Sequence, residues 1–143
     1  MEVQSMKKCL NFVLAISTMF CLALPAAATS VTIGEYNYSI PSGSTEWNGK
    51  SKGFLFGTYE GDATWYVSND NTSPSVNAKL MMVKRLFPDS QVASRSNIKN
   101  GSTSATFVAS GENGYYSVIT AANNHGTTGT TWVTQDSSIV NMK

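Results

Sequence analysis

The sequence predicts an all-β protein: a small, single-domain, antiparallel β-sandwich of about seven to eight strands. Three observations indicate this class. Apolar and polar residues alternate over short segments that are rich in β-branched and aromatic residues. Clusters of turn-forming residues separate these segments. The part of the chain that follows the leader has the length of one domain with one core.

The first 28 residues have the pattern of a secretory signal peptide. Lys7 and Lys8 precede the uncharged run 9–24, and the small residues at 25–28 follow with the A-x-A spacing. The run is shorter than the roughly 20 apolar residues of a transmembrane helix, and polar residues interrupt it. Cleavage before Thr29 predicts a secreted domain, 29–143, of 115 residues without stable membrane insertion.

Cysteine content indicates how the exported chain is stabilised, and net charge indicates which classes of partner it binds. Cys9 and Cys21 both lie in the predicted leader, so the mature chain is expected to fold without disulfides. It carries eight basic and eight acidic residues, so its net charge is near zero. This balance argues against nucleic acid or an anionic membrane as the main partner. The overall composition is typical of a bacterial exported protein.

Several strands can be assigned from alternation and turn signals. The segment 31–40 is the expected first strand, and 130–135 is the expected last one. Between them, 53–59 and 63–68 are predicted to pair as a hairpin around a Glu-Gly-Asp turn. The segment 69–75 consists almost entirely of turn formers and is expected to be an exposed loop.

The segment 78–87 allows two interpretations. As a helix, it places Leu80, Val83 and Phe87 on one face. As a strand, it pairs with 91–96 after a turn at residues 88–90. We prefer the strand because the flanking segments are short strands, which favours a sandwich or barrel over a mixed fold.

The segment 104–122 is predicted to be the central β-hairpin, with its turn at 111–114. Two registers are compatible with this turn. In both of them, Phe107 shares the more apolar face with Tyr116 and Val118. We therefore expect Phe107 to be a core residue.

Candidate catalytic residues are few. His125 is the only histidine, it lies in a loop of small polar residues, and the chain has no G-x-S-x-G motif. Glu60 and Asp62 resemble a glycosidase pair, but their spacing around Gly61 is explained by a turn. No catalytic residue is predicted.

Metal and cofactor motifs are equally sparse. With one histidine and no cysteine in the mature chain, transition-metal ligands are missing. Asn69, Asp70 and Asn71 offer oxygen atoms to calcium, but one carboxylate is too few for a full site. Phosphate-cradling glycine loops are absent. No metal or cofactor is predicted.

Aromatic residues are the remaining candidates for function. Trp47 lies in the polar segment 41–52, where an exposed ring is expected. Neighbours such as Trp65-Tyr66 and Tyr115-Tyr116 must point to opposite sheet faces, so one member of each pair can be exposed. Exposed rings can stack on sugars or insert into a partner, although they can also cap the ends of a sandwich. The predicted binding residues are Trp47, Tyr66, Tyr115 and Trp132.

These observations favour a secreted, non-catalytic domain that binds an extracellular polysaccharide, wall polymer or protein. The alternative is a small secreted antimicrobial or toxin-like protein that acts on the envelopes of competitors. A secreted hydrolase ranks third.

Overall fold

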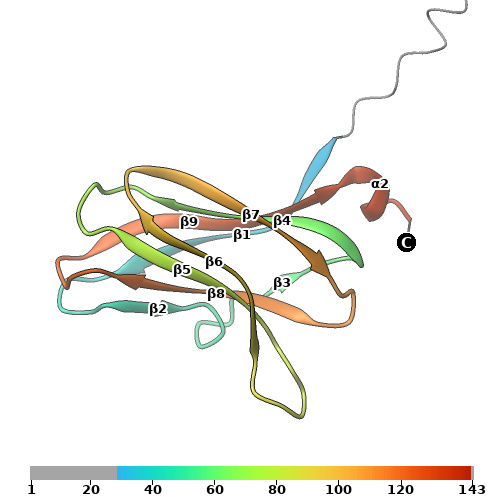
Figure 1. The fold of residues 1–143 in the computed structure, drawn as a ribbon, viewed down its shortest axis with the longest axis horizontal. Helices are drawn as coiled ribbons and strands as arrows, with labels where there is room; N and C mark the ends of the chain where they lie inside the picture. The colour runs from blue at the N-terminus through green and yellow to red at the C-terminus, as the bar shows by residue number, and fades with distance from the viewer. Residues whose placement is uncertain (1–28, 143) are drawn as a thin grey trace, which may run out of the picture.

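A computed structural model describes residues 29–142 as two β-sheets packed face to face (Figure 1). The predicted signal peptide, residues 1–28, lies outside the described residues. The elements, in chain order, are β1 (Ser30–Ile40), β2 (Glu46–Asn48), β3 (Phe56–Gly57), β4 (Gly61–Asn69), β5 (Val76–Met82), β6 (Ser90–Ile98), β7 (Gly101–Ala109), β8 (Gly114–Ala121), β9 (Thr127–Asp136) and α2 (Ser137–Val140).

The two sheets have defined strand orders and antiparallel pairing. The four-stranded sheet has the order β1-β9-β4-β7. The five-stranded sheet has the order β2-β8-β5-β6, and β3 pairs with β8 at its side. The predicted all-β sandwich is confirmed, with nine strands in residues 29–142. No helix in this range is long and apolar enough to cross a membrane.

The core lies between the sheets and includes one polar cluster. Trp65 of β4 is fully buried, and its indole N–H lies 2.9 Å from the hydroxyl of Ser117 and 3.0 Å from that of Thr131. Those two hydroxyls are themselves 2.7 Å apart. Because Ser117 belongs to β8 and the other two residues to the opposite sheet, the cluster links the layers and satisfies polar groups that would be costly to bury alone.

Several of the predicted strands are confirmed. The segment 31–40 corresponds to β1, and 130–135 lies within β9. The ambiguous segment 78–87 begins as a strand: β5 runs to Met82 and pairs with β6, as the strand interpretation predicted. The residues after Met82 form an exposed connection instead of continuing the strand.

The central hairpin prediction is wrong, because β7 and β8 belong to different sheets. β7 pairs with β4, whereas β8 pairs with β5, β2 and β3. The turn thus carries the chain from one layer to the other. Phe107 is buried as expected, at 8 % exposed, but its ring packs across the core against Tyr115, with centroids 5.1 Å apart. Tyr116 is on the opposite face of β8, outside the core cluster.

The predicted pairing of 53–59 with 63–68 is also wrong. Only Phe56 and Gly57 form a strand in the first segment, and they pair with β8. β4 pairs instead with β7 and β9. The buried ring of Phe56 lies 5.1 Å from that of Tyr36 of β1, so β3 packs beside β1 at the edge of the sandwich instead of joining β4.

Candidate binding face

The outer face of the four-stranded sheet carries the partly exposed aromatic residues that the sequence singled out. Side chains alternate along β4 and β9, so that Trp65 and Val133 point into the core while Tyr66 and Trp132 point outward. The register places Tyr66 directly opposite Trp132. We call this surface the outer β4–β9 face.

The two rings form a parallel, offset stack. Their centroids are 5.0 Å apart and their planes differ by 2°. Each ring therefore covers part of one face of the other. Glu35 of β1 is opposite Trp132, and Ser104 of β7 is opposite Tyr66. Among residues 29–142, neither the Tyr66 hydroxyl nor the Trp132 indole N–H has a hydrogen-bond partner, so both are available to a ligand.

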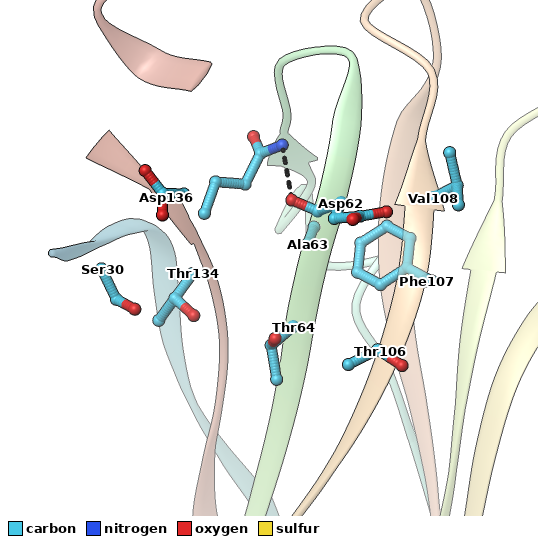
Figure 2. Close-up of a pocket in the computed structure, with 10 residues that line it drawn as sticks. Ser30, Asp62, Ala63, Thr64, Thr106, Phe107, Val108, Thr134 and Asp136 are labelled. Atoms are coloured by element: carbon cyan, nitrogen blue, oxygen red, sulfur yellow. Dashed lines mark hydrogen bonds between the residues drawn. The ribbon is translucent and has the colours of Figure 1, made fainter. Parts of the chain in front are cut away.

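A row of threonines lies next to the aromatic pair. Thr32, Thr134, Thr64 and Thr106 occupy aligned positions on the four strands β1, β9, β4 and β7. Figure 2 shows Thr134, Thr64 and Thr106 on neighbouring strands. These three threonines line a hollow of about 470 Å³. This row presents hydroxyl groups, each of which can donate and accept a hydrogen bond.

Two carboxylates stand at the far end of the hollow. Asp62 and Asp136 both line it (Figure 2). Asp136 caps α2: its carboxylate accepts hydrogen bonds from the hydroxyl and backbone N–H of Ser138, and these bonds lower the pKa of Asp136. Asp136 therefore remains a hydrogen-bond acceptor at neutral pH.

The expectation of an exposed Trp47 is wrong. The residue is 5 % exposed and belongs to the core. The segment that looked like a polar loop contains β2, in which Trp47 pairs with Ile119 of β8. Its ring packs between those of Tyr38 and Phe54, with both centroid distances at 6.0 Å. A ring held in this way cannot serve as a surface anchor.

Tyr115 is also in the core, so its predicted exposure is wrong. It is 1 % exposed, and its hydroxyl accepts a hydrogen bond from the backbone N–H of Ser110 at 2.9 Å. The pair 115–116 does point to opposite faces, as expected. Tyr116, the outward member, is covered by the side chain of Lys50, whose ammonium lies 5.7 Å from the ring centroid.

The candidates for catalysis and metal binding are dispersed. The imidazole of the exposed His125 makes no hydrogen bond to any residue in 29–142. The side-chain oxygen of Asn69 is occupied by Thr127 and the backbone of Asn71, and Asp70 accepts from Thr128. Over the same range, no group of three or more His, Cys, Asp or Glu side chains could hold a metal ion.

Sequence reasoning identified the two rings of the outer β4–β9 face but missed the threonines and carboxylates beside them. The signal was present in the segment 130–136, where Thr130, Trp132, Thr134 and Asp136 alternate with the core residues. The alternation predicts which residues share a face. It does not reveal that β4 is the neighbour of β9.

Comparison with known proteins identifies no family for this chain. No family profile matches it, and no curated protein sequence does.

Solved structures with a similar arrangement of strands include three unrelated kinds of protein. The Yersinia pseudotuberculosis-derived mitogen is 8 % identical and has a TM-score of 0.49; the match covers 76 % of this chain and 86 % of that one. A pilus protein of Bacillus endospore appendages is 13 % identical, with a TM-score of 0.46 and coverages of 78 % and 90 %. A variant of a family 29 carbohydrate-binding module is 12 % identical, with a TM-score of 0.40 and coverages of 77 % and 93 %. These likenesses concern the layout of a β-sandwich and are too distant to assign a ligand.

Proposed function

We propose that this protein is a secreted, non-catalytic module that binds a polysaccharide on its outer β4–β9 face. The observation that carries the proposal is the Tyr66–Trp132 stack, which presents aromatic surface beside a row of hydroxyl groups. Binding sites combine apolar surface with a few convergent polar groups in this way.

The chemistry of a sugar ring matches this surface. One face of many pyranose rings is lined by C–H groups and packs against aromatic rings, while the hydroxyls at its rim need donors and acceptors. The second ring faces of Tyr66 and Trp132 would supply the stacking. Thr64, Thr134 and the carboxylate of Asp136 would supply the hydrogen bonds.

The composition of the face favours a polysaccharide over a protein. Protein interfaces are depleted in Ser and Asp, and Thr and Ser are under-represented among the residues that dominate their affinity. The outer β4–β9 face has these residues around its two rings. Export, which the leader pattern predicts, would expose the module to wall or extracellular polymers.

The test is affinity gel electrophoresis of the chain from Thr29 through gels that contain soluble glucans, mannans, galactans or wall polymers. We expect at least one polymer to retard the wild type. Trp132→Ala should weaken that binding about 30-fold, as expected when an anchoring ring is removed. Tyr66→Ala should act in the same direction because it removes the stacking partner.

Two control variants separate binding from folding. Val118→Ala removes a side chain from the outer face of the other sheet, and Phe87→Ala removes an exposed ring far along the chain from the stack. Both should migrate as the wild type does. Absence of retardation by every polymer, or equal retardation of Trp132→Ala and wild type, would contradict the proposal.

A further inference from the structure

The connection between β5 and β6 carries two adjacent apolar side chains that are largely exposed. Leu86 is 85 % exposed and Phe87 is 73 % exposed. Figure 1 shows this connection extending beyond both sheets. Leu and Phe are among the residues most often buried in folded proteins. Two such neighbours exposed at the end of a projecting loop therefore indicate a surface that binds a membrane or another molecule. We call residues 84–88 the β5–β6 tip.

The base of the tip is fixed to the sandwich. The Asp89 carboxylate accepts hydrogen bonds from the backbone N–H of Lys84 at 3.0 Å, from the Lys50 ammonium at 2.7 Å and from the Tyr116 hydroxyl at 2.7 Å. The backbone N–H of Val83 donates to the carbonyl of Gly114 at 2.9 Å. These hydrogen bonds therefore hold the base of the tip in a defined position on the sandwich.

The charge of the tip differs from that of the whole chain. Lys84 and Arg85 precede the apolar pair, and no acidic residue lies among residues 84–88. The nearest carboxylate in sequence, Asp89, is paired with Lys50. The chain-wide balance of charge argued against an anionic membrane as main partner. Within residues 29–142, however, neither Lys84 nor Arg85 has an ion-pair partner, and both lie beside the apolar apex of the tip.

We propose that the β5–β6 tip docks on an anionic lipid bilayer. Leu86 and Phe87 would enter the boundary between headgroups and acyl chains, and Lys84 and Arg85 would contact the lipid phosphates. Five residues are far fewer than the 20–30 that each partner contributes to a standard protein interface. A soluble polyanion would use the cations but would leave the apolar pair in water. A bilayer accommodates both.

The experiment uses the chain from Thr29, which contains every strand and core residue described above. Sedimentation is measured with phosphatidylcholine vesicles and with vesicles that also contain phosphatidylglycerol. We expect binding to the anionic vesicles only, and loss of binding at 1 M salt. The paired substitution K84S/R85S should weaken binding about 30-fold, since each charge contributes about fivefold. L86S/F87S should weaken it at least as much.

Matched controls use residues away from the tip. Lys99→Ser removes an exposed cation from the β6–β7 turn, and Trp132→Ala alters the outer β4–β9 face. Neither should change vesicle binding. All substituted tip residues are exposed, so the unfolding midpoints should stay within a narrow range of the wild type.

Insertion of the tip into the bilayer can be measured with a fluorophore on a single introduced cysteine, because the chain from Thr29 has no cysteine of its own. F87C carrying a polarity-sensitive fluorophore should shift its emission to the blue on anionic vesicles, whereas V108C, at an exposed position on β7, should not. Failure of the wild type to bind anionic vesicles would overturn the proposal. Undiminished binding of L86S/F87S would also overturn it, since a purely electrostatic contact, as with a soluble polyanion, would then explain the result.

Discussion

The three tryptophans have three different surroundings, and these surroundings determine what each contributes. Trp65 is fully buried, with its N–H hydrogen-bonded to hydroxyls of both sheets. Trp47 is buried and packs among aromatic rings, and its indole N–H makes no hydrogen bond to any residue in 29–142. Trp132 is partly exposed and stacks on Tyr66. Only the last has the position of a binding residue.

Trp47→Ala should lower the free energy of unfolding by about 3 to 5 kcal/mol, the usual cost of removing a buried large aromatic side chain. Trp132→Ala should cost about 1 kcal/mol, since it loses mainly a surface ring stack. Denaturant unfolding of both variants measures the difference. Equal losses of unfolding free energy in the two variants would contradict the assignment of Trp47 to the core and Trp132 to the surface.

Gly129 of β9 is required by close packing. A Cβ at this position would overlap the carbonyl oxygen of Ser68 and the ring of Tyr38, whose hydroxyl donates to that same carbonyl at 2.7 Å. Burial raises the pKa of Tyr38 above its ordinary value, so this hydroxyl stays a donor.

Gly129→Ala should therefore lower the free energy of unfolding by about 3 kcal/mol, in the upper part of the range for overpacking. Gly57→Ala is the matched control, because a Cβ there meets nothing within 4 Å. Thermal unfolding of both variants tests this. A Gly129→Ala variant as stable as the control would show that β9 can shift away from Tyr38.

At the scale of elements, local alternation predicted where strands lie better than it predicted their partners. The segments that became β1, β5 and β9 were recognised, because alternation and turn residues are local properties. The pairing of β7 with β8 was wrong, because a turn that crosses between sheets has the same composition as a hairpin turn. Which sheet a strand joins depends on segments far away in sequence.

The same limit applies to the candidate site. Tyr66 and Trp132 could be predicted as outward residues, since each is next to a core residue in an alternating strand. Their contact could not, because it requires β4 and β9 to be neighbours. The burial of Trp47 could not be predicted either, since β2 has only three residues and too little alternation to be recognised.

The hydrogen bonds of Asp89 at the base of the β5–β6 tip predict how the stability of the fold depends on pH. Hydrogen bonds from Lys50, Tyr116 and the backbone of Lys84 lower the pKa of Asp89 to about 2. An unfolded aspartate has a pKa of about 3.9. The ionised carboxylate therefore stabilises the fold above about pH 4, and this contribution is lost as the pH falls through about 2.

Asp89→Asn should consequently have a lower unfolding midpoint than the wild type at pH 6, and the gap should close as both proteins are brought to pH 2. Thermal unfolding over this range measures the gap. If the difference between the two unfolding midpoints stayed constant down to pH 2, Asp89 would stabilise the fold through the shape of its side chain and not through its charge.

At the scale of the whole molecule, the sandwich separates two surfaces of different chemistry. The outer β4–β9 face has stacked rings and hydroxyls, whereas the β5–β6 tip has an apolar apex and two cations. The tip is attached through Asp89 to β8, which belongs to the sheet opposite the proposed sugar site. Substitutions on one of the two surfaces should therefore leave binding at the other surface unchanged.

The proposed function requires export, which the leader pattern predicts. Intact-mass measurement on culture supernatant should give the mass of a chain that begins at Thr29, since cleavage is expected after the A-x-A sequence. A mass that includes residues 1–28, or a lipid adduct on Cys21, would contradict export by this route.

Sugar binding on the outer β4–β9 face is tested most directly by following the three indole N–H signals in a two-dimensional NMR spectrum while an oligosaccharide of the retarding polymer is added. We expect the Trp132 signal to shift and saturate, while the signals of the buried Trp47 and Trp65 stay in place. Assignment by Trp132→Phe removes the one signal in question. Saturating shifts at Trp47 or Trp65 with none at Trp132 would contradict binding on the outer β4–β9 face.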